Sequence, residues 1–317
     1  MKFPVFDLHC DTALAILGDD LMGEKNLRAN DLHIDLERAK TLDGYAQCFA
    51  CFTFPDIELP SGKTVVHLFE REVDVIHRDV QANSDLIRIA YSAQEVREND
   101  EAGLMSAILT IEGPAGFDFD PALLEDLYNL GFRISTLTWN EKNPLAGSHK
   151  TGGGLTEKGR EYVREAQRVG MLIDVSHLSD EAFWDLMEIT TAPIIASHSN
   201  SRSVCGVSRN LTDEMFLAIC STGGVAGINL YSAFLGDVPT VDTVCDHIFH
   251  FMKLDPTGRH IALGGDLDGC ESIAAGMSGI QDYPRIAQRL LSRGLDEETV
   301  HRIFWDNALE VLEKCSM

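Results

Sequence analysis

Two hydrophobic patterns alternate along the chain. Short apolar runs, several of them rich in β-branched residues, are typical of strands that are buried on both faces. They predict strands at Phe3–Leu8, Tyr45–Phe54, Met105–Ile111, Arg133–Thr138, Met171–Val175, Pro193–Ser197, Val225–Leu230 and His260–Gly264. Stretches with helical spacing predict helices at Val65–Gln81, Ala122–Leu130, Glu157–Val169, Asp180–Ile189, Asp213–Cys220, Thr240–Met252, Pro284–Ser292 and about Glu297–Lys314.

Eight strands that alternate with helices predict an α/β fold, a (β/α)8 barrel of the TIM type. A doubly wound open sheet is the alternative. Barrels of this kind run to roughly 200–400 residues as one domain, so the 317 residues predict a single domain over positions 1–317. The segment 140–154 follows the fourth predicted strand and is expected to form a long loop on the catalytic face.

Charge narrows the range of partners. The chain carries 26 Lys and Arg against 50 Asp and Glu, a net charge of −24. Such an acidic protein repels a phosphate backbone and an anionic membrane surface, so we expect no nucleic-acid and no membrane partner. Small molecules are the expected partners.

The termini and the cysteines indicate a cytoplasmic protein. The segment 1–9 reaches an aspartate and a histidine too early for a signal peptide, and no apolar run approaches the roughly 20 residues of a membrane span. Eight cysteines are too few for a disulfide framework, so we expect reduced thiols. Cys48 and Cys51 form a CxxC, but on a strand they would point to opposite faces and could not bind one metal ion.

Residues that bind metal ions gather where the predicted strands end. Since the carboxyl ends of barrel strands meet in one pocket, these side chains are expected to converge. They are His9 and Asp11 after the first strand, Glu112 after the third, His177 after the fifth, His198 after the sixth, and Asp266 and Asp268 after the eighth.

Each of these residues alone has an ordinary structural explanation, such as a helix cap. Together they offer the nitrogen and oxygen ligands that Zn²⁺ and similar divalent ions prefer. Three imidazoles and two or three carboxylates exceed one tetrahedral shell, and a carboxylate can bridge two ions. We therefore predict a site for two metal ions.

In combination, the motifs resemble the renal (membrane) dipeptidase family, zinc metallopeptidases of the amidohydrolase-type barrels. The resemblance extends over almost the whole chain. It rests on His9-x-Asp11, Glu112-Gly113, Asp174-Val175-Ser176-His177, Ser197-His198-Ser199 and Gly264-Gly265-Asp266-Leu267-Asp268-Gly269. It implies a soluble, bacterial-type member, for which a homodimer would be an ordinary state.

The resemblance also implies roles for individual residues. His9 and Asp11 would bind one Zn²⁺ ion, His177 and His198 the other, and Glu112 would bridge the two. Asp266 would be the catalytic proton-transferring carboxylate, with Asp268 as the alternative. Arg209 would bind the carboxylate of the substrate, and Tyr231 would make a further substrate contact.

One position departs from the family. Where characterised mammalian members have a histidine that orients and polarises the scissile group, this chain has Trp139. An indole donates one hydrogen bond but cannot accept a proton or bind zinc. Either that role is dispensable, or His149 in the following loop supplies it. The departure bears on substrate range more than on the chemistry.

These features predict a metallo-dipeptidase that hydrolyses free dipeptides with a hydroxide bridging two Zn²⁺ ions. Both L-Xaa-L-Xaa and L-Xaa-D-Xaa substrates are expected from the resemblance. One alternative is an amidohydrolase that acts on N-acyl amino acids or cyclic amides with the same site. The other is a catalytically silent metal-binding barrel, which would be expected to lack a ligand.

Overall fold

The computed structural model describes residues 3–23 and 25–314 and shows a parallel α/β barrel. Eight strands follow one another around it in the order β7-β6-β5-β4-β2-β1-β9-β8. Their bounds are β1 Val5–Cys10, β2 Tyr45–Phe52, β4 Met105–Glu112, β5 Phe132–Thr136, β6 Leu172–Asp174, β7 Ile194–Ile195, β8 Ala226–Ile228 and β9 Ile261–Leu263. The predicted barrel is thereby confirmed.

Short parallel contacts between β7 and β8 close the ring. Ala196 pairs with Ala226, and the amides of Ala196 and Gly227 donate to the carbonyls of Val225 and Ala196. An open doubly wound sheet has no such closure between its two edge strands. The pairing of β1 with β2 shifts register between Asp7 and Cys10, and this irregularity includes His9. Such irregularities often re-aim a side chain beside an active site.

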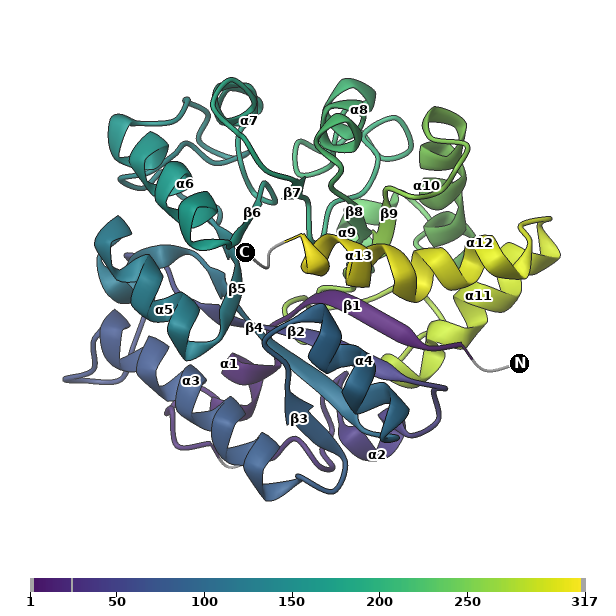
Figure 1. Ribbon diagram of the computed structural model, residues 1–317, viewed down its shortest axis with the longest axis horizontal. Helices are drawn as coiled ribbons and strands as arrows, with labels where there is room; N and C mark the ends of the chain where they lie inside the picture. The colour runs from purple at the N-terminus through teal and green to yellow at the C-terminus, as the bar shows by residue number, and fades with distance from the viewer. Residues whose placement is uncertain (1–2, 24, 315–317) are drawn as a thin grey trace.

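Helices surround the strands (Figure 1). They are α1 Thr12–Leu17, α2 Leu36–Ala39, α3 Val65–Ala82, α4 Ala93–Glu101, α5 Leu124–Leu130, α6 Glu157–Val169, α7 Asp180–Met187, α8 Asp213–Thr222, α9 Ser232–Leu235, α10 Val241–Leu254, α11 Tyr283–Ser292, α12 Glu297–His301 and α13 Asn307–Glu313. Side-chain caps explain where α3, α6 and α7 begin. In each, the hydroxyl of the residue before the helix accepts a hydrogen bond from the third backbone amide of the helix; these residues are Thr64, Thr156 and Ser179. None of the helices within the described residues has both the length and the apolar character needed to cross a membrane.

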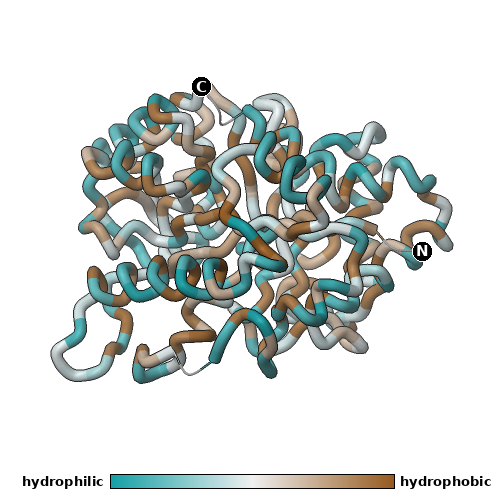
Figure 2. Tube along the Cα trace, turned by 60° about the horizontal axis from the view of Figure 1, so that its bottom comes forward, coloured by the Kyte–Doolittle hydropathy of each residue, from teal (hydrophilic) through white to brown (hydrophobic). Residues whose placement is uncertain are grey.

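Apolar side chains form two layers. One cluster combines residues from strands all around the ring, including Phe6, Ile108 and Ile134, with Leu309 and Leu312 of α13. It therefore fills the barrel interior, and α13 crosses one end of the barrel (Figure 1). The other cluster lies between the strands and the surrounding helices. In Figure 2, hydrophilic and hydrophobic residues alternate along the outer helices, as expected of helices that bury one face.

Several boundaries differ from the predictions. The sequence pattern missed β3, Ile87–Ile89, which pairs with Met105–Ala107 of β4, and the helix α4 that follows it. The predicted last helix is broken at residues 302–306 by a π-helical segment. The first strand continues to Cys10, so His9 lies within it and not after it. Hydrogen bonds to neighbouring strands decide where the strands begin and end. Local hydrophobic spacing does not reveal which strands will be neighbours.

The CxxC cysteines lie on opposite faces of β2. Cys48 belongs to the interior cluster and Cys51 to the outer one. They are therefore not directed at one metal ion. The thiols of cysteines 10, 51, 205, 220, 245 and 270 are free, and Cys315 lies outside the described residues.

Candidate active site and metal centre

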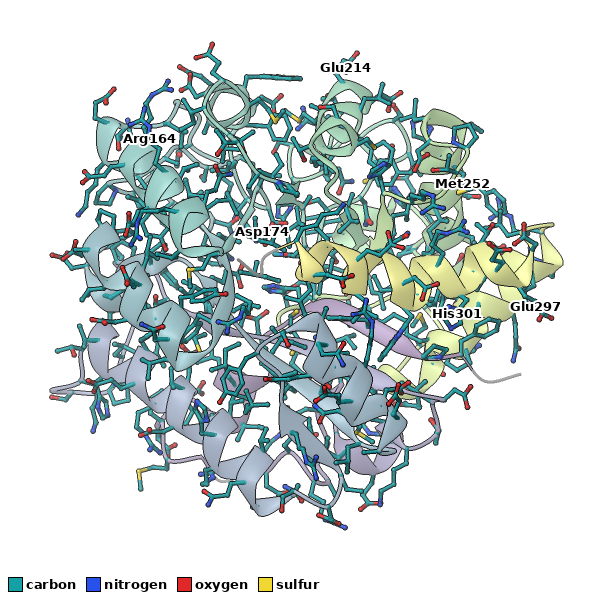
Figure 3. All side chains as sticks on the ribbon, viewed as in Figure 1. Arg164, Asp174, Glu214, Met252, Glu297 and His301 are labelled. Carbon is teal, nitrogen blue, oxygen red and sulfur yellow. The ribbon has the colours of Figure 1, made fainter. Side chains whose placement is uncertain are left out.

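A cavity of about 460 Å³ lies where the strands end. Eight of the predicted site residues line it: Asp11, Glu112, Trp139, His149, His177, Tyr231, Asp266 and Asp268. His9, His198 and Arg209 are buried beside it. The residues that the sequence predicted to converge thus come from the ends of five separate strands to one place. In Figure 3, Asp174 lies towards the centre of the barrel, while Arg164 and Glu214 lie on its rim.

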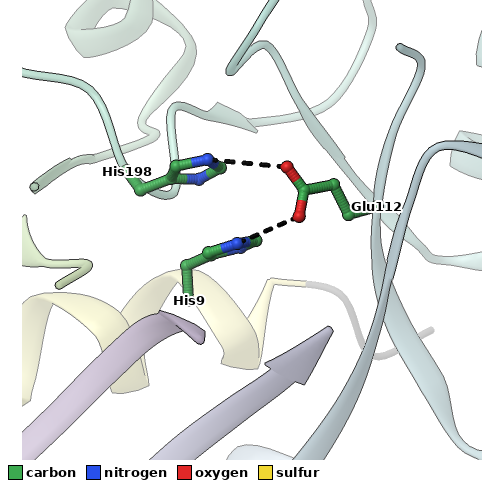
Figure 4. Close-up of side chains that lie close together, drawn as sticks. All are labelled: His9, Glu112 and His198. Carbon is green, nitrogen blue, oxygen red and sulfur yellow. Dashed lines mark ion pairs between the residues drawn. The ribbon is translucent and has the colours of Figure 1, made fainter. Parts of the chain in front are cut away.

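Glu112 is at the centre of this cluster, at the last position of β4. Its Oε2 lies 3.1 Å from His9 Nε2, while its Oε1 lies 3.1 Å from His177 Nε2 and 3.7 Å from His198 Nε2. Figure 4 shows the two oxygens turned to different imidazoles. A carboxylate in this position can serve two groups of ligands at once.

Hydrogen bonds fix the tautomers of two of the imidazoles. His198 Nδ1 lies 2.6 Å from Ser197 Oγ, and this hydroxyl donates to Asp174, so Nδ1 of His198 carries the proton. His177 Nδ1 lies 3.2 Å from the side-chain oxygen of Asn140. The lone pairs of both Nε2 atoms then face each other across 3.0 Å. Two lone pairs repel at this distance unless a cation lies between or beside them.

The ionisation of His177 and His198 also suits a cation, whereas His9 and Glu112 favour their protonated forms in the metal-free site. Burial holds the pKa values of His177 and His198 well below the usual range, which leaves both imidazoles neutral, as metal ligands must be. Burial also opposes charge on His9, but the carboxylates of Glu112 and Asp11 outweigh it and hold its pKa well above the usual value. Burial raises the pKa of Glu112 to about 7.

Two groups of side chains could each hold a metal ion. His9, Glu112 and His198 form one, and His9, Asp11 and Asp266 form the other. Within the described residues, His9 Nε2 and Asp11 Oδ1 are buried without a hydrogen-bond partner. Buried polar atoms without partners are costly, so atoms of this kind mark a place for a ligand. Nitrogen and oxygen donors in this arrangement fit divalent metal ions such as Zn²⁺.

Two buried aspartates that the sequence analysis did not assign as supports position the ligand-bearing strands. Asp7 Oδ1 accepts the amides of His9 and Gly265 at 3.0 Å, joining β1 to the segment after β9. Asp174 Oδ1 accepts the amides of Ser176 and Ser197 at 2.9 Å, joining β6 to the segment after β7. In both cases an aspartate in a strand accepts a hydrogen bond from the backbone amide two residues further along the chain. An aspartate at this spacing before a metal-binding segment is the signal that the sequence offers.

The backbone is also unusual at the site. His177, Asp266 and Asp268 have φ values of 71°, 56° and 66°. Such positive values are uncommon for residues other than glycine and cluster at functional sites.

The structure gives Asp266 and Asp268 different surroundings. Asp266 Oδ1 lies 3.9 Å from His9 Nε2, and its Oδ2 accepts Asn229 Nδ2 at 3.0 Å. Asp268 accepts Thr12 Oγ1 at 2.7 Å and the amide of His33 at 2.5 Å. Both oxygens of Asp268 are thus engaged in holding loops together, whereas Asp266 faces the metal-binding side chains.

Arg209 is almost fully buried. Its Nη1 donates to Ser199 Oγ at 2.6 Å, whereas Nε and Nη2 have no hydrogen-bond partner among the described residues, and the guanidinium carbon lies 5.7 Å from the centroid of the Phe234 ring. Burial lowers the pKa of Arg209 from its usual value. Tyr231 lines the cavity, and its hydrogen bond with Glu271 raises the pKa of the phenol to about 12.

Trp139 and His149 make different kinds of contact. The indole packs against Phe52 and Phe54, with ring centroids 5.1 and 4.7 Å away. His149 uses both ring nitrogens, since Nε2 lies 2.8 Å from Asn140 Oδ1 and Nδ1 lies 3.0 Å from Ser208 Oγ. Asn140, which the sequence analysis did not single out, therefore lies between His149 and His177.

Comparisons with known proteins identify relatives of this chain. The family model of membrane dipeptidases, peptidase family M19, matches residues 1–317. An uncharacterized dipeptidase of Schizosaccharomyces pombe is 32% identical over 248 residues, 76% of this chain, and the match spans 61% of that relative. The dipeptidase verJ of Clonostachys rogersoniana is 28% identical over 328 residues, 98% of this chain and 84% of its own length.

Solved structures show the same likeness. A metallopeptidase from Rhodobacter sphaeroides, crystallised with a phosphinate mimic of the dipeptide L-Ala-D-Ala, has a TM-score of 0.88 and 25% identity, with 100% of both chains covered. The match over the full chain, the barrel and the His, Asp and Glu cluster agree with one another. The chain belongs to the membrane dipeptidase family, peptidase family M19, and is a metallo-dipeptidase.

Proposed function

We propose that this enzyme hydrolyses the peptide bond of free dipeptides, both L-Xaa-L-Xaa and L-Xaa-D-Xaa, with two divalent metal ions, Zn²⁺ first among them. The observation that carries the proposal is the convergence of three imidazoles on the two oxygens of Glu112, next to an arginine with unpaired nitrogens. The Rhodobacter relative that binds an L-Ala-D-Ala mimic supports the choice of substrate.

Five residues would hold the metal ions. His9 and Asp11 would hold one, His177 and His198 the other, and Glu112 would contribute one oxygen to each. When bound, two such ions would supply Lewis acidity and lower the pKa of water towards neutrality. The facing lone pairs of His177 and His198 and the unpartnered atoms of His9 and Asp11 support this assignment.

Asp266 would move the proton. It accepts the proton of the attacking water as the oxygen adds to the peptide carbonyl carbon, then delivers it to the nitrogen as the carbon–nitrogen bond breaks. Burial raises the pKa of Asp266 from its ordinary value, which brings this carboxyl closer to the pH at which it must both take and give a proton.

Arg209 would select dipeptides. A guanidinium with free Nε and Nη2 can hold a carboxylate through two parallel hydrogen bonds. A carboxylate one residue beyond the scissile bond exists in a dipeptide and not within a longer chain. Tyr231, Trp139 and His149 would form parts of the surrounding wall, which the cavity lining supports.

The test is amine release by the zinc-reconstituted protein from L-Xaa-L-Xaa and L-Xaa-D-Xaa dipeptides, tripeptides and N-acyl amino acids. Turnover restricted to dipeptides is the expected result. Activity on N-acyl amino acids alone would reassign the substrate while leaving the metal site in place. No turnover with two ions bound would contradict the proposed reaction.

A further inference from the structure

The side-chain amide of Asn140 lies between two imidazoles at the edge of the cavity. Its Oδ1 is 3.2 Å from His177 Nδ1 and 2.8 Å from His149 Nε2. The residue also lines the cavity itself. One small side chain thus contacts a metal-binding histidine, a second histidine and the space that a substrate would occupy.

The hydrogen bonds determine which way the amide points. His177 Nε2 faces Glu112 and His198, so a metal ion there needs the lone pair of Nε2 and leaves the proton on Nδ1. Only an oxygen accepts that proton, so Oδ1 of Asn140 faces His177. The same oxygen accepts from His149 Nε2. Nδ2 is left with two N–H groups and no acceptor among the described residues.

Neither neighbour of Asn140 offers an equivalent donor as close to the metal-binding cluster. His149 donates its Nε2 proton to Asn140, and its Nδ1 accepts from Ser208 Oγ. Trp139 packs among Phe52 and Phe54, with its ring centroid 6.4 Å from that of His177. Asn140 instead contacts the His177 ring directly.

We propose that Asn140 is a further catalytic residue, whose Nδ2 donates a hydrogen bond to the carbonyl oxygen of the scissile peptide as water adds, while its Oδ1 holds His177 in the metal-binding tautomer. The inference rests on the proposed dipeptide hydrolysis. His149 contacts Asn140 through Nε2 and Ser208, the residue next to Arg209 in the chain, through Nδ1, so Asn140 lies on the side of the cavity where Arg209 would hold the substrate. Negative charge on the carbonyl oxygen grows as water adds, and the hydrogen bond strengthens with it.

Asn140→Asp separates the two functions of the amide. It has the same shape and keeps an oxygen for His177 and His149, but it has no N–H group for the substrate. Loss of an oxyanion donor typically costs about 10²–10³ in kcat. We expect Asn140→Asp to bind two zinc ions like the wild type, to lose about that factor in kcat, and to bind a phosphinate dipeptide mimic correspondingly more weakly. Asn140→Ala loses both functions, so its zinc affinity should fall as well.

Two variants and one spectroscopic measurement provide controls. Ser208→Ala removes the hydrogen bond to His149 Nδ1 and leaves Asn140 unchanged. Its kcat should stay within about threefold of the wild type, a much smaller change than the loss of an oxyanion donor causes. Trp139→Phe removes the indole N–H. ¹⁵N NMR of the metal-free protein should show His177 protonated on Nδ1 in the wild type and in Asn140→Asp, and a mixture of tautomers in Asn140→Ala.

The outcomes decide between the candidates. Near wild-type kcat and phosphinate affinity in Asn140→Asp would overturn the proposed donor while leaving dipeptide hydrolysis intact. A large loss in Trp139→Phe with an active Asn140→Asp would assign the donor to the indole and overturn the proposal for Asn140. A wild type that hydrolyses no dipeptide would overturn both the proposed function and this inference.

Discussion

The carboxylate of Asp174 is connected to the imidazole of His198 through a single hydroxyl group. His198 Nδ1 donates to Ser197 Oγ at 2.6 Å, and that hydroxyl donates in turn to Asp174. The same carboxylate holds the amides of Ser176 and Ser197. Asp174 thereby fixes both the tautomer of His198 and the path of the chain that carries it.

Replacement of Asp174 by asparagine should loosen the metal site. An amide in its place cannot accept all of the hydrogen bonds that the carboxylate accepts, so His198 loses its fixed orientation. Loss of such outer support typically reduces metal affinity by about 10–100-fold. Competition with a zinc chelator measures the change. Asp126→Asn, at an exposed position on α5, is the matched control. Unchanged zinc affinity in Asp174→Asn would show that the hydrogen bonds from His198 through Ser197 to Asp174 do not support the metal site.

Replacement of Glu112 by alanine should affect both metal ions. Its two oxygens face different imidazoles, so its removal takes one ligand from each proposed ion. We expect metal content to fall below two ions per chain and kcat to fall by at least about 10³, measured by elemental analysis and amine release. Glu214→Ala on the rim of the barrel controls for loss of a glutamate (Figure 3). Retention of two tightly bound ions would exclude the bridging role.

Asp266→Asn and Asp268→Asn should behave differently. Asp266 faces His9, so its replacement removes the proton carrier, and kcat should fall by about 10²–10⁴ with metal content maintained. Asp268 accepts from Thr12 and His33, so its replacement should lower the melting temperature, with a smaller effect on kcat. The reverse pattern would assign the proton-transfer role to Asp268.

Arg209→Met should stabilise the substrate-free protein while impairing its activity. The buried guanidinium has two nitrogens without partners among the described residues, and an unsatisfied buried polar group typically costs about 1–3 kcal/mol. We therefore expect a higher melting temperature and a loss of at least about 10²-fold in kcat/KM, with both metal ions retained. A variant with unchanged kcat/KM, or one that loses its metal ions, would contradict the role in substrate binding.

Glu72 on α3 predicts a specific dependence of stability on pH. Its side chain is fully buried, and neither carboxylate oxygen has a hydrogen-bond partner of ordinary geometry among the described residues. Burial raises its pKa well above the reference value of 4.5, and the backbone of Phe52 offsets only part of this. Because the folded state binds the proton more tightly, its stabilising contribution is complete below pH 4.5 and is lost as the pH rises towards the folded pKa.

Glu72→Gln removes this titration. In the metal-free protein, we expect the variant to gain stability over the wild type as the pH rises above 4.5, because the wild type loses the contribution of the bound proton and the amide does not titrate. Urea unfolding at pH 4.5 and at pH 8 measures the difference. A difference independent of pH would mean that Glu72 is ionised in the folded protein, in conflict with its burial.

The sequence by itself was sufficient for the fold class and for most of the side chains that gather at the candidate site. Strand and helix periods are local properties, so the eight barrel strands could be read from spacing. Parallel strands place their carboxyl ends together, so Glu112, His177 and His198 could be predicted to converge without a structure. The family resemblance, carried by the same residues, agrees with the match over residues 1–317.

Only the tertiary structure decided how those side chains are held. The strand β3 exists because it pairs with β4. Asp268 accepts a hydrogen bond from the amide of His33, which lies 235 residues away in the chain. The tautomers of His177 and His198 depend on Asn140, Ser197 and Asp174, and the free nitrogens of Arg209 depend on what surrounds them. Residue type and spacing determine which groups can reach the pocket. Hydrogen bonds between distant segments determine which atoms remain available there, and those partners exist only once the barrel has closed.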